Sequence, residues 1–401
     1  MSFHLEDDHI AVAQKFVRKA RAAGGLAPMD IERFWADDSE AQKDPFGPDI
    51  PQVPFGAHCW EECIFDELGI PEDRRRFESD PQWLCEAAKA YNDKAETIVG
   101  RRLLSELPPA TDADPACIGP IKQLHDVFEM PNVWNEDSQS YWLRESATNE
   151  DELKALLDRV DERDIRSFIL PDNWDELKPK LVRSGSFPPA YRSQRGPVTF
   201  STSLYGTDRL ILLINDNPDL AARLRDTIIR VMIDIAEVLD VEAGRTGDSE
   251  PRGWYWLDDN CCLLSPEMYE FYGYPIVQAM FDRFAPNPGD RRGQHSDSAM
   301  GHLLPILARC NLHDCNFGPT LTVSEIRRHM PNTVIHGQLA PFTYSRNEEV
   351  NMVAEFLRDF QQAREHRGLV FATAGSVNNG SRLTGMRLLM AAIQEFGRYG
   401  R

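Results

Sequence analysis

The chain has 401 residues, 42% hydrophobic and 27% charged, which is typical of a soluble globular protein with a sizeable core. Its formal net charge of −20 excludes the broad basic surface that binding to nucleic acid or to an anionic membrane requires. No apolar run reaches about 18 residues, no signal-peptide pattern is present, and eight scattered cysteines indicate reduced thiols. We therefore expect a cytoplasmic protein.

Residues 1–114 are predicted to form a helical and proline-rich extension that packs on the rest of the chain. Helical patterns cover 5–23, 57–68 and 80–105. Four prolines between residues 45 and 54 forbid a continuous helix there and predict an extended arm laid over another surface.

Residues 115–401 are predicted to form an α/β domain. After strands or loop at 115–145 and a helix at 149–162, strands and helices alternate from about residue 165, which indicates a parallel sheet. The predicted strands cover 166–170, 196–203, 252–258, 292–295, 312–317, 333–338 and 368–374. The predicted helices cover 218–241, 266–285, 298–310, 323–330, 347–364 and 383–397.

Polar side chains follow consecutive predicted strands at the point where each strand ends. They are Asp258, Asp259, His295, Asp297, Asn316, Gln338, Ser376 and Asn378. In a barrel of parallel strands all C-terminal ends converge on one mouth, whereas an open sheet brings together only the two strands at its switch point. Five such strand ends therefore favour a TIM (β/α)8 barrel with an N-terminal helical extension.

Several segments carry a family resemblance: DDNCCLLSPEMYEFYGYPIVQAMFDRF, QHSDSAMGHLLPIL, NFGP, VIHGQLAPFTYS and TAGSVNNGSRLTGMRLLMAAI. Over roughly residues 190–400 the chain resembles the uroporphyrinogen decarboxylase (URO-D) superfamily, which comprises haem-pathway decarboxylases and corrinoid- or coenzyme-M-linked methyltransferases on a TIM barrel. The decarboxylases hold their substrate's carboxylates with an arginine-rich N-terminal segment. Residues 25–60 here contain a single arginine, Arg33, so the resemblance lies nearer the methyltransferases.

The methyltransferases of this superfamily bind zinc through a histidine, a cysteine two residues later, and a second cysteine after the last strand. The matching positions here are His295, Asp297 and Ser376, so the histidine is kept and both thiolates are replaced. A carboxylate and a hydroxyl make a harder site, which suits an oxygen-bound substrate and zinc or another divalent metal, or no metal at all.

Three interpretations of His295 and Asp297 stay open. They bind a divalent ion, helped by Asp258 or Asp259, as a Lewis-acid centre. They form a metal-free acid/base pair in which the carboxylate orients the imidazole. Or the histidine merely donates to the aspartate and stabilises the barrel mouth.

Other polar residues are weaker candidates. Asn316, Gln338, His336 and Asn378 are expected to contact substrate, although Gln338 could instead tie adjacent loops together, and His336 could face either the barrel interior or the helices. Two arginines, Arg192 and Arg195, precede the predicted strand 196–203 at the end away from the mouth, so we expect them to form surface ion pairs rather than to bind anions.

The resemblance implies an enzyme that demethylates a small O- or N-methylated compound and passes the methyl group to a corrinoid on a separate partner protein. The chain has no Asp-x-His-x-x-Gly pattern with which to hold a corrinoid itself. The alternatives are a metal-free decarboxylase or lyase acting on a small carboxylated substrate, and a non-catalytic barrel that binds a corrinoid or tetrapyrrole. A homodimer is expected from the relatives.

Overall fold

The computed structural model describes residues 5–106, 121–184, 188 and 190–399. The chain divides into two compact units, each described here by itself. The first consists of residues 1–109, 295–304 and 311–401, and the second of residues 110–294 and 305–310. The predicted domain boundary between residues 114 and 115 lies outside the described residues.

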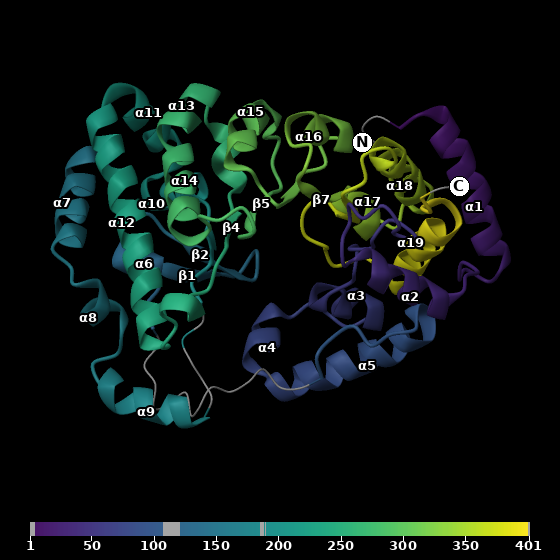
Figure 1. The fold of residues 1–401 in the computed structure, drawn as a ribbon. Helices are drawn as coiled ribbons and strands as arrows, with labels where there is room; N and C mark the ends of the chain where they lie inside the picture. The colour runs from purple at the N-terminus through teal and green to yellow at the C-terminus, as the bar shows by residue number, and fades with distance from the viewer. Residues whose placement is uncertain (1–4, 107–120, 185–187, 189, 400–401) are drawn as a thin grey trace. The chain divides into compact units, whose positions relative to one another are not determined.

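The first unit contains the N-terminal helices and the C-terminal β/α repeats (Figure 1). Its N-terminal elements are α1 (Asp7–Ala22), α2 (Ile31–Ala41), the 3-10 helix η1 (Glu61–Cys63), α3 (Ile64–Leu68), α4 (Arg74–Ser79) and α5 (Pro81–Val99). The repeats are β6 (Asp314–Phe317), α16 (Val323–His329), β7 (Val334–Leu339), α17 (Pro341–Ser345), α18 (Glu349–Ala363), β8 (Leu369–Thr373) and α19 (Leu383–Phe396). Helix α1 packs on α18, and α5 packs on α19.

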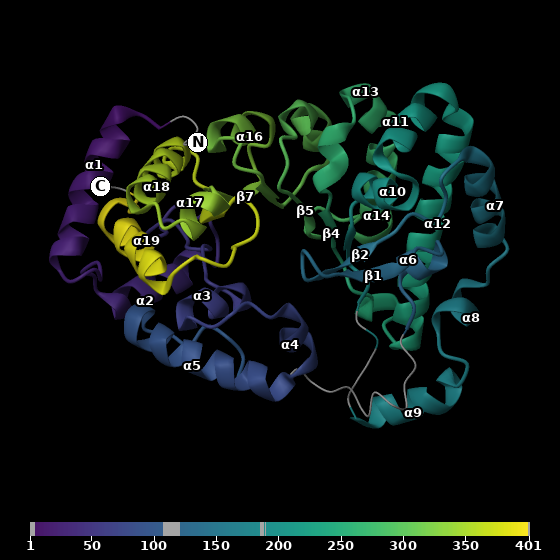
Figure 2. The same cartoon turned by 180° about the vertical axis from the view of Figure 1, so that it is seen from behind.

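The second unit is mostly helical and is built around the 25-residue helix α12 (Pro218–Glu242), which packs against α7, α8 and α14 (Figure 2). Its other helices are α6 (Leu124–Val127), α7 (Glu150–Asp161), α8 (Ile165–Ile169), α9 (Trp174–Ser184), α10 (Pro197–Tyr205), α11 (Thr207–Asp216), α13 (Pro266–Phe271) and α14 (Gly273–Phe284). Its strands are the hairpin β1 (Asn132–Asn135) and β2 (Ser140–Leu143), then β3 (Ser193–Arg195) and β4 (Trp254–Leu257).

The strands of the main sheet follow one another in chain order, β3-β4-β5-β6-β7-β8. Strand β5 (Arg292–Ser296) begins in the second unit and ends in the first. The pairs β3–β4, β6–β7 and β7–β8 are parallel, and β7 meets β8 with His336 opposite Val370 and Gln338 opposite Ala372. Parallel strands joined by helices confirm the α/β fold class that the sequence predicts.

The proline-rich arm lies against β8, whereas the sequence predicted an extended arm without indicating which surface it covers. Phe55 bridges Phe371 in a parallel sense, and the amide of Phe371 donates to the carbonyl of Pro54 at 2.8 Å. The amide of Gly56 donates in turn to the carbonyl of Phe371, also at 2.8 Å. These bonds satisfy the outer edge of β8, which would otherwise present unpaired backbone groups.

Two of the predicted strands are wrong, because residues 166–170 and 196–203 lie in the helices α8 and α10. Helix α10 is buried on nearly every side, so its sequence shows no alternation of apolar and polar residues at helical spacing. Pro197 at its first position, a residue that suits a helix start, was the local signal for a helix. Helix α8 spans only five residues, too few to show a period.

No helix in the described ranges is long and apolar enough to cross a membrane.

The buried guanidinium of Arg327 joins two segments, one before β7 and one before β8. It donates to the carbonyls of Met330, Pro331 and Thr333 before β7, at 3.2, 2.8 and 2.7 Å. It also donates to the carbonyls of Arg367 and Gly368 before β8, at 3.0 and 3.1 Å.

We expect Arg327→Met to lower the free energy of unfolding by roughly 3 kcal/mol, because the buried carbonyls lose their donor. Urea denaturation followed by circular dichroism measures this change. The neighbouring exposed Arg328→Met removes the same charge and serves as the control. Equal stability of the two variants would contradict a structural role for Arg327.

Candidate functional site

His295 and Asp297 lie at the end of β5, where the alternation of a strand places residues two apart on the same face. Their side chains contact each other, with Nε2 of His295 2.9 Å from Oδ1 of Asp297. The imidazole is largely buried, with 17% of its side chain exposed, whereas 48% of the Asp297 side chain is exposed. The pair thus presents one accessible carboxylate and one sheltered ring.

Asn316, in β6, determines the orientation of the His295 ring. Its Nδ2 donates to the carbonyls of His336 and Thr373, at 2.5 and 2.8 Å, so the amide oxygen must face the other way. That oxygen lies 2.7 Å from Nδ1 of His295 and accepts a hydrogen bond from it. Nδ1 therefore carries a proton, and Nε2 is the ring atom available to Asp297, a metal or a substrate.

The loop after β8 leaves space for the Asp297 carboxylate only because residue 375 is a glycine. Gly375 has a φ of 120°, and a Cβ there would lie 2.6 Å from Oδ1 of Asp297. The next residue, Ser376, is exposed and lines a cavity that Asn316 also lines. The structure thus brings together three elements that the sequence predicted to meet: the ends of β5, β6 and β8.

The cavity has a volume of about 370 Å³. Besides Asn316 and the β8 loop, it is lined by Gly56 at the end of the proline-rich arm and by Trp60, Glu61 and Glu62. These residues of the N-terminal extension were not predicted as site residues. The extended arm was visible in the sequence, but nothing local indicated that it would reach the C-terminal end of β8.

The remaining candidates of the first unit, Gln338, His336 and Asn378, are not among the described residues that line this cavity. Gln338 is buried, and its Nε2 donates to the carbonyls of Gly318 and Leu321 at 3.2 and 2.9 Å. These bonds agree with the alternative that Gln338 ties adjacent loops together. His336 contributes its carbonyl to Asn316, and the carbonyl of Asn378 accepts from Sγ of Cys63 at 3.8 Å. Direct contact of these three residues with substrate stays a prediction.

Asp258 and Asp259 belong to the second unit and follow β4. Asp258 continues the buried face of Trp254 and Trp256 and is itself fully buried. Its Oδ1 accepts from the backbone N and the Oγ1 of Thr199, at 2.8 and 2.9 Å. Asp258 therefore caps α10, whose own N-cap residue is a glycine and offers no side-chain oxygen.

Gly196 is required for this cap, because a Cβ there would lie 2.0 Å from the Cβ of Asp258. Burial raises the pKa of Asp258 to about 6, against the lowering effect of the Thr199 hydrogen bonds. Asp259 begins the 3-10 helix η3 (Asp259–Leu263).

The donors at the end of β5 fit a divalent ion. Nε2 of His295 and Oδ1 of Asp297 lie 2.9 Å apart, so one divalent ion could take a nitrogen and an oxygen ligand from this pair. Asn316 supplies the outer hydrogen bond that a ligating histidine usually makes. Ser376 offers a further oxygen.

The region that contains these residues matches a known protein family. The family model for uroporphyrinogen decarboxylase (URO-D) matches residues 192–396, just over half of the chain. Among solved structures, a methyltransferase from Methanosarcina mazei has 14% sequence identity to this chain and a TM-score of 0.49, covering 92% of this chain and 99% of its own. A search of curated proteins found no match.

The raised pKa of Asp258 predicts a pH-dependent stability difference. As pH rises from about 4 to 6, the unfolded chain loses the Asp258 proton before the folded chain does, so the wild type becomes less stable relative to Asp258→Asn. We expect this relative change to reach on the order of 3 kcal/mol above pH 6.

Chemical denaturation at intervals between pH 4 and pH 7.5 measures this difference. Asp248→Asn, at an exposed position of the same unit, is the control and should show no such trend. A constant difference between Asp258→Asn and wild type across this range would contradict a raised pKa at Asp258.

Proposed function

Because the chain belongs to the uroporphyrinogen decarboxylase family, whose TIM-barrel fold agrees with the one expected from the sequence, we propose that it is an enzyme of the methyltransferase type. In this proposal it removes a methyl group from a small O- or N-methylated substrate, and a corrinoid on a separate protein accepts it. The observation that carries the proposal is the His295–Asp297 pair, with His295 oriented by Asn316.

His295, Asp297 and Ser376 would hold a divalent metal. Bound there, zinc or a harder divalent ion would supply Lewis-acid polarisation of the substrate's oxygen or nitrogen. A histidine, a carboxylate and a hydroxyl prefer oxygen- and nitrogen-bound substrates over thiols, because the soft thiolate ligands are replaced.

The chain's own residues would position the substrate and stabilise charge. When the bond between the methyl carbon and the heteroatom breaks, the bonding electron pair stays on the heteroatom while the methyl group leaves without it. The negative charge that develops there has to be stabilised at the strand ends. Asn316 keeps Nε2 of His295 pointed in one direction, so no reorientation of the ring is needed during the reaction.

A metal-free decarboxylase is the second candidate, and one observation favours it. Both ring nitrogens of His295 lie near oxygen acceptors, Oδ1 of Asn316 and Oδ1 of Asp297, so a ring protonated on both nitrogens would have an acceptor for each proton. An imidazolium can give its Nε2 proton to the carbon from which carbon dioxide has left. The electron pair of the broken C–C bond would then form the new C–H bond.

Metal content distinguishes the two candidates. We expect the purified wild type to contain close to one divalent ion per chain by inductively coupled plasma mass spectrometry, after reconstitution with zinc or manganese. His295→Ala and Asp297→Asn should each lose most of this metal, because each removes one ligand of a small set. His366→Ala, at an exposed position of the same unit, should retain it.

Absence of stoichiometric metal from every sample after reconstitution would reject the Lewis-acid proposal. Equal metal content in the wild type, His295→Ala and Asp297→Asn would place the ion elsewhere. In either case the metal-free acid/base role of His295 becomes the leading one.

Methyl transfer itself can be followed with free cob(I)alamin in place of the partner protein. Incubation with a panel of methoxylated and N-methylated compounds should convert cob(I)alamin to methylcobalamin, seen as a change in the visible spectrum. We expect the rate to fall by about a hundredfold or more in His295→Ala, the order of effect of removing a positioned catalytic group.

Asn316→Leu should lower kcat more than it raises KM, because it releases the ring of His295 without removing it. Production of carbon dioxide from carboxylated compounds, with no methyl transfer, would favour the decarboxylase instead.

A further inference from the structure

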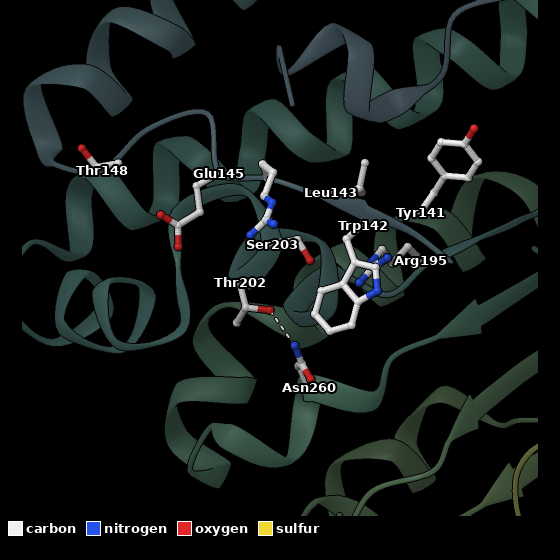
Figure 3. Close-up of a pocket in the computed structure, with 10 residues that line it drawn as sticks. Tyr141, Trp142, Leu143, Glu145, Thr148, Arg195, Thr202, Ser203 and Asn260 are labelled. Atoms are coloured by element: carbon white, nitrogen blue, oxygen red, sulfur yellow. Dashed lines mark hydrogen bonds between the residues drawn. The ribbon is translucent and has the colours of Figure 1, made fainter. Parts of the chain in front are cut away.

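A second and larger cavity lies within the second unit and is not explained by the groups at the end of β5. Its volume is about 760 Å³, and residues of the β1–β2 hairpin, β3, α10 and the turn after β4 line it. Figure 3 shows the side chains of Trp142, Arg195, Thr202, Ser203 and Asn260 around this space. All of these residues belong to one unit.

Three charged residues line this cavity, Arg144, Glu145 and Arg195, and the position of Arg195 differs from the sequence prediction. The residues expected to form the following strand make the helix α10, and Arg195 is itself the last residue of β3. Arg195 thus lies at the C-terminal end of a strand in the parallel sheet, the end at which ligands of α/β proteins bind, and not at the opposite end.

Arg195 makes no direct hydrogen bond or ion pair with the described residues, whereas its neighbour Arg192 pairs with the buried Asp240 instead of forming the surface ion pair that the sequence predicted. Surrounding atoms lower the pKa of Arg195 by partial desolvation, and the nearby carboxylates of Asp259 and Asp258 partly offset this effect. Arg195 is an exposed residue, and an accessible guanidinium without a partner can gain strong charge-assisted hydrogen bonds from an added anion.

The groups near Arg195 complete a site for a small molecule with an acidic group. Trp142 and Tyr141, on β2, are 51% and 57% exposed, and the indole Nε1 of Trp142 donates to Oγ of Ser140 at 2.9 Å, which limits its rotation. Nδ2 of Asn260 donates to Oγ1 of Thr202 at 2.8 Å. The acidic lining residue Glu145 is paired with Arg209, so its charge is compensated.

We propose that this cavity binds a small anion, a carboxylate or a phosphate ester, whose acidic group is held by the guanidinium of Arg195 and whose planar or apolar body packs against Trp142. In a chain with a net charge of −20, an anion needs such a local arginine, because the overall field repels it. The inference does not depend on the proposed methyl transfer, since either candidate reaction could use an acidic substrate.

Three probes of similar shape test the proposal: benzoate, phenyl phosphate and the uncharged benzamide. Their dissociation constants for the full-length protein can be measured by ligand-observed nuclear magnetic resonance. We expect at least one of the two anions to bind about tenfold more tightly than benzamide, the effect of a charge-assisted bidentate contact. Preference for benzoate would indicate a carboxylate ligand, and preference for phenyl phosphate a phosphate ester.

Arg195→Gln should abolish the preference for the anions and leave benzamide binding unchanged, which also shows that the cavity is intact. Arg309→Gln, a surface arginine of the same unit paired with Glu270, removes the same charge and should keep the preference. Trp142→Ala should raise the dissociation constants of all three probes alike, by about three- to tenfold.

Equal affinity for the anions and benzamide in the wild type would overturn the proposal. So would an anion preference that survives Arg195→Gln or is lost equally in Arg309→Gln, because the preference would then come from the general surface. Failure of all three probes to bind would also overturn it.

Discussion

The amide of Asn316 is the interaction on which the candidate site depends. Its nitrogen is committed to two backbone carbonyls, of His336 in β7 and Thr373 in β8, so its oxygen can only face His295. One side chain thus joins the ends of three strands and determines which nitrogen of the imidazole carries a proton. Both candidate reactions require this arrangement, whether Nε2 binds a metal or donates a proton.

The positions of the polar residues at strand ends could be predicted because the alternation of a strand is local and strict. Placing His295 at the end of a buried strand already implies that Asp297 shares its face. The buried segment Trp254–Leu257 likewise implies that Asp258 continues an inward face. The five strands from β4 to β8 were predicted, and this information sufficed for the fold class.

The two misassigned strands show what local sequence patterns cannot predict. Helix α10 contains three β-branched residues, one Val and two Thr, and is buried on nearly every side, so propensity and periodicity both favoured a strand. Its cap comes from Asp258, about sixty residues later in the chain, and no local pattern reports a contact at that distance. Because of the same error, Arg195 was predicted to lie at the N-terminal end of a strand, so the sequence did not indicate that it lines a cavity.

The proline-rich arm has a consequence for how the protein folds. Its pairing with β8 joins residue 55 to residue 371, a contact across most of the chain, and the same arm delivers Gly56 to the cavity near Ser376. Closing so long a loop costs chain entropy before it returns any stabilising contact, so such pairings form late. The site at the end of β5 would therefore gain its outer wall only after the C-terminal repeats have been synthesised, and an incomplete chain would lack that wall.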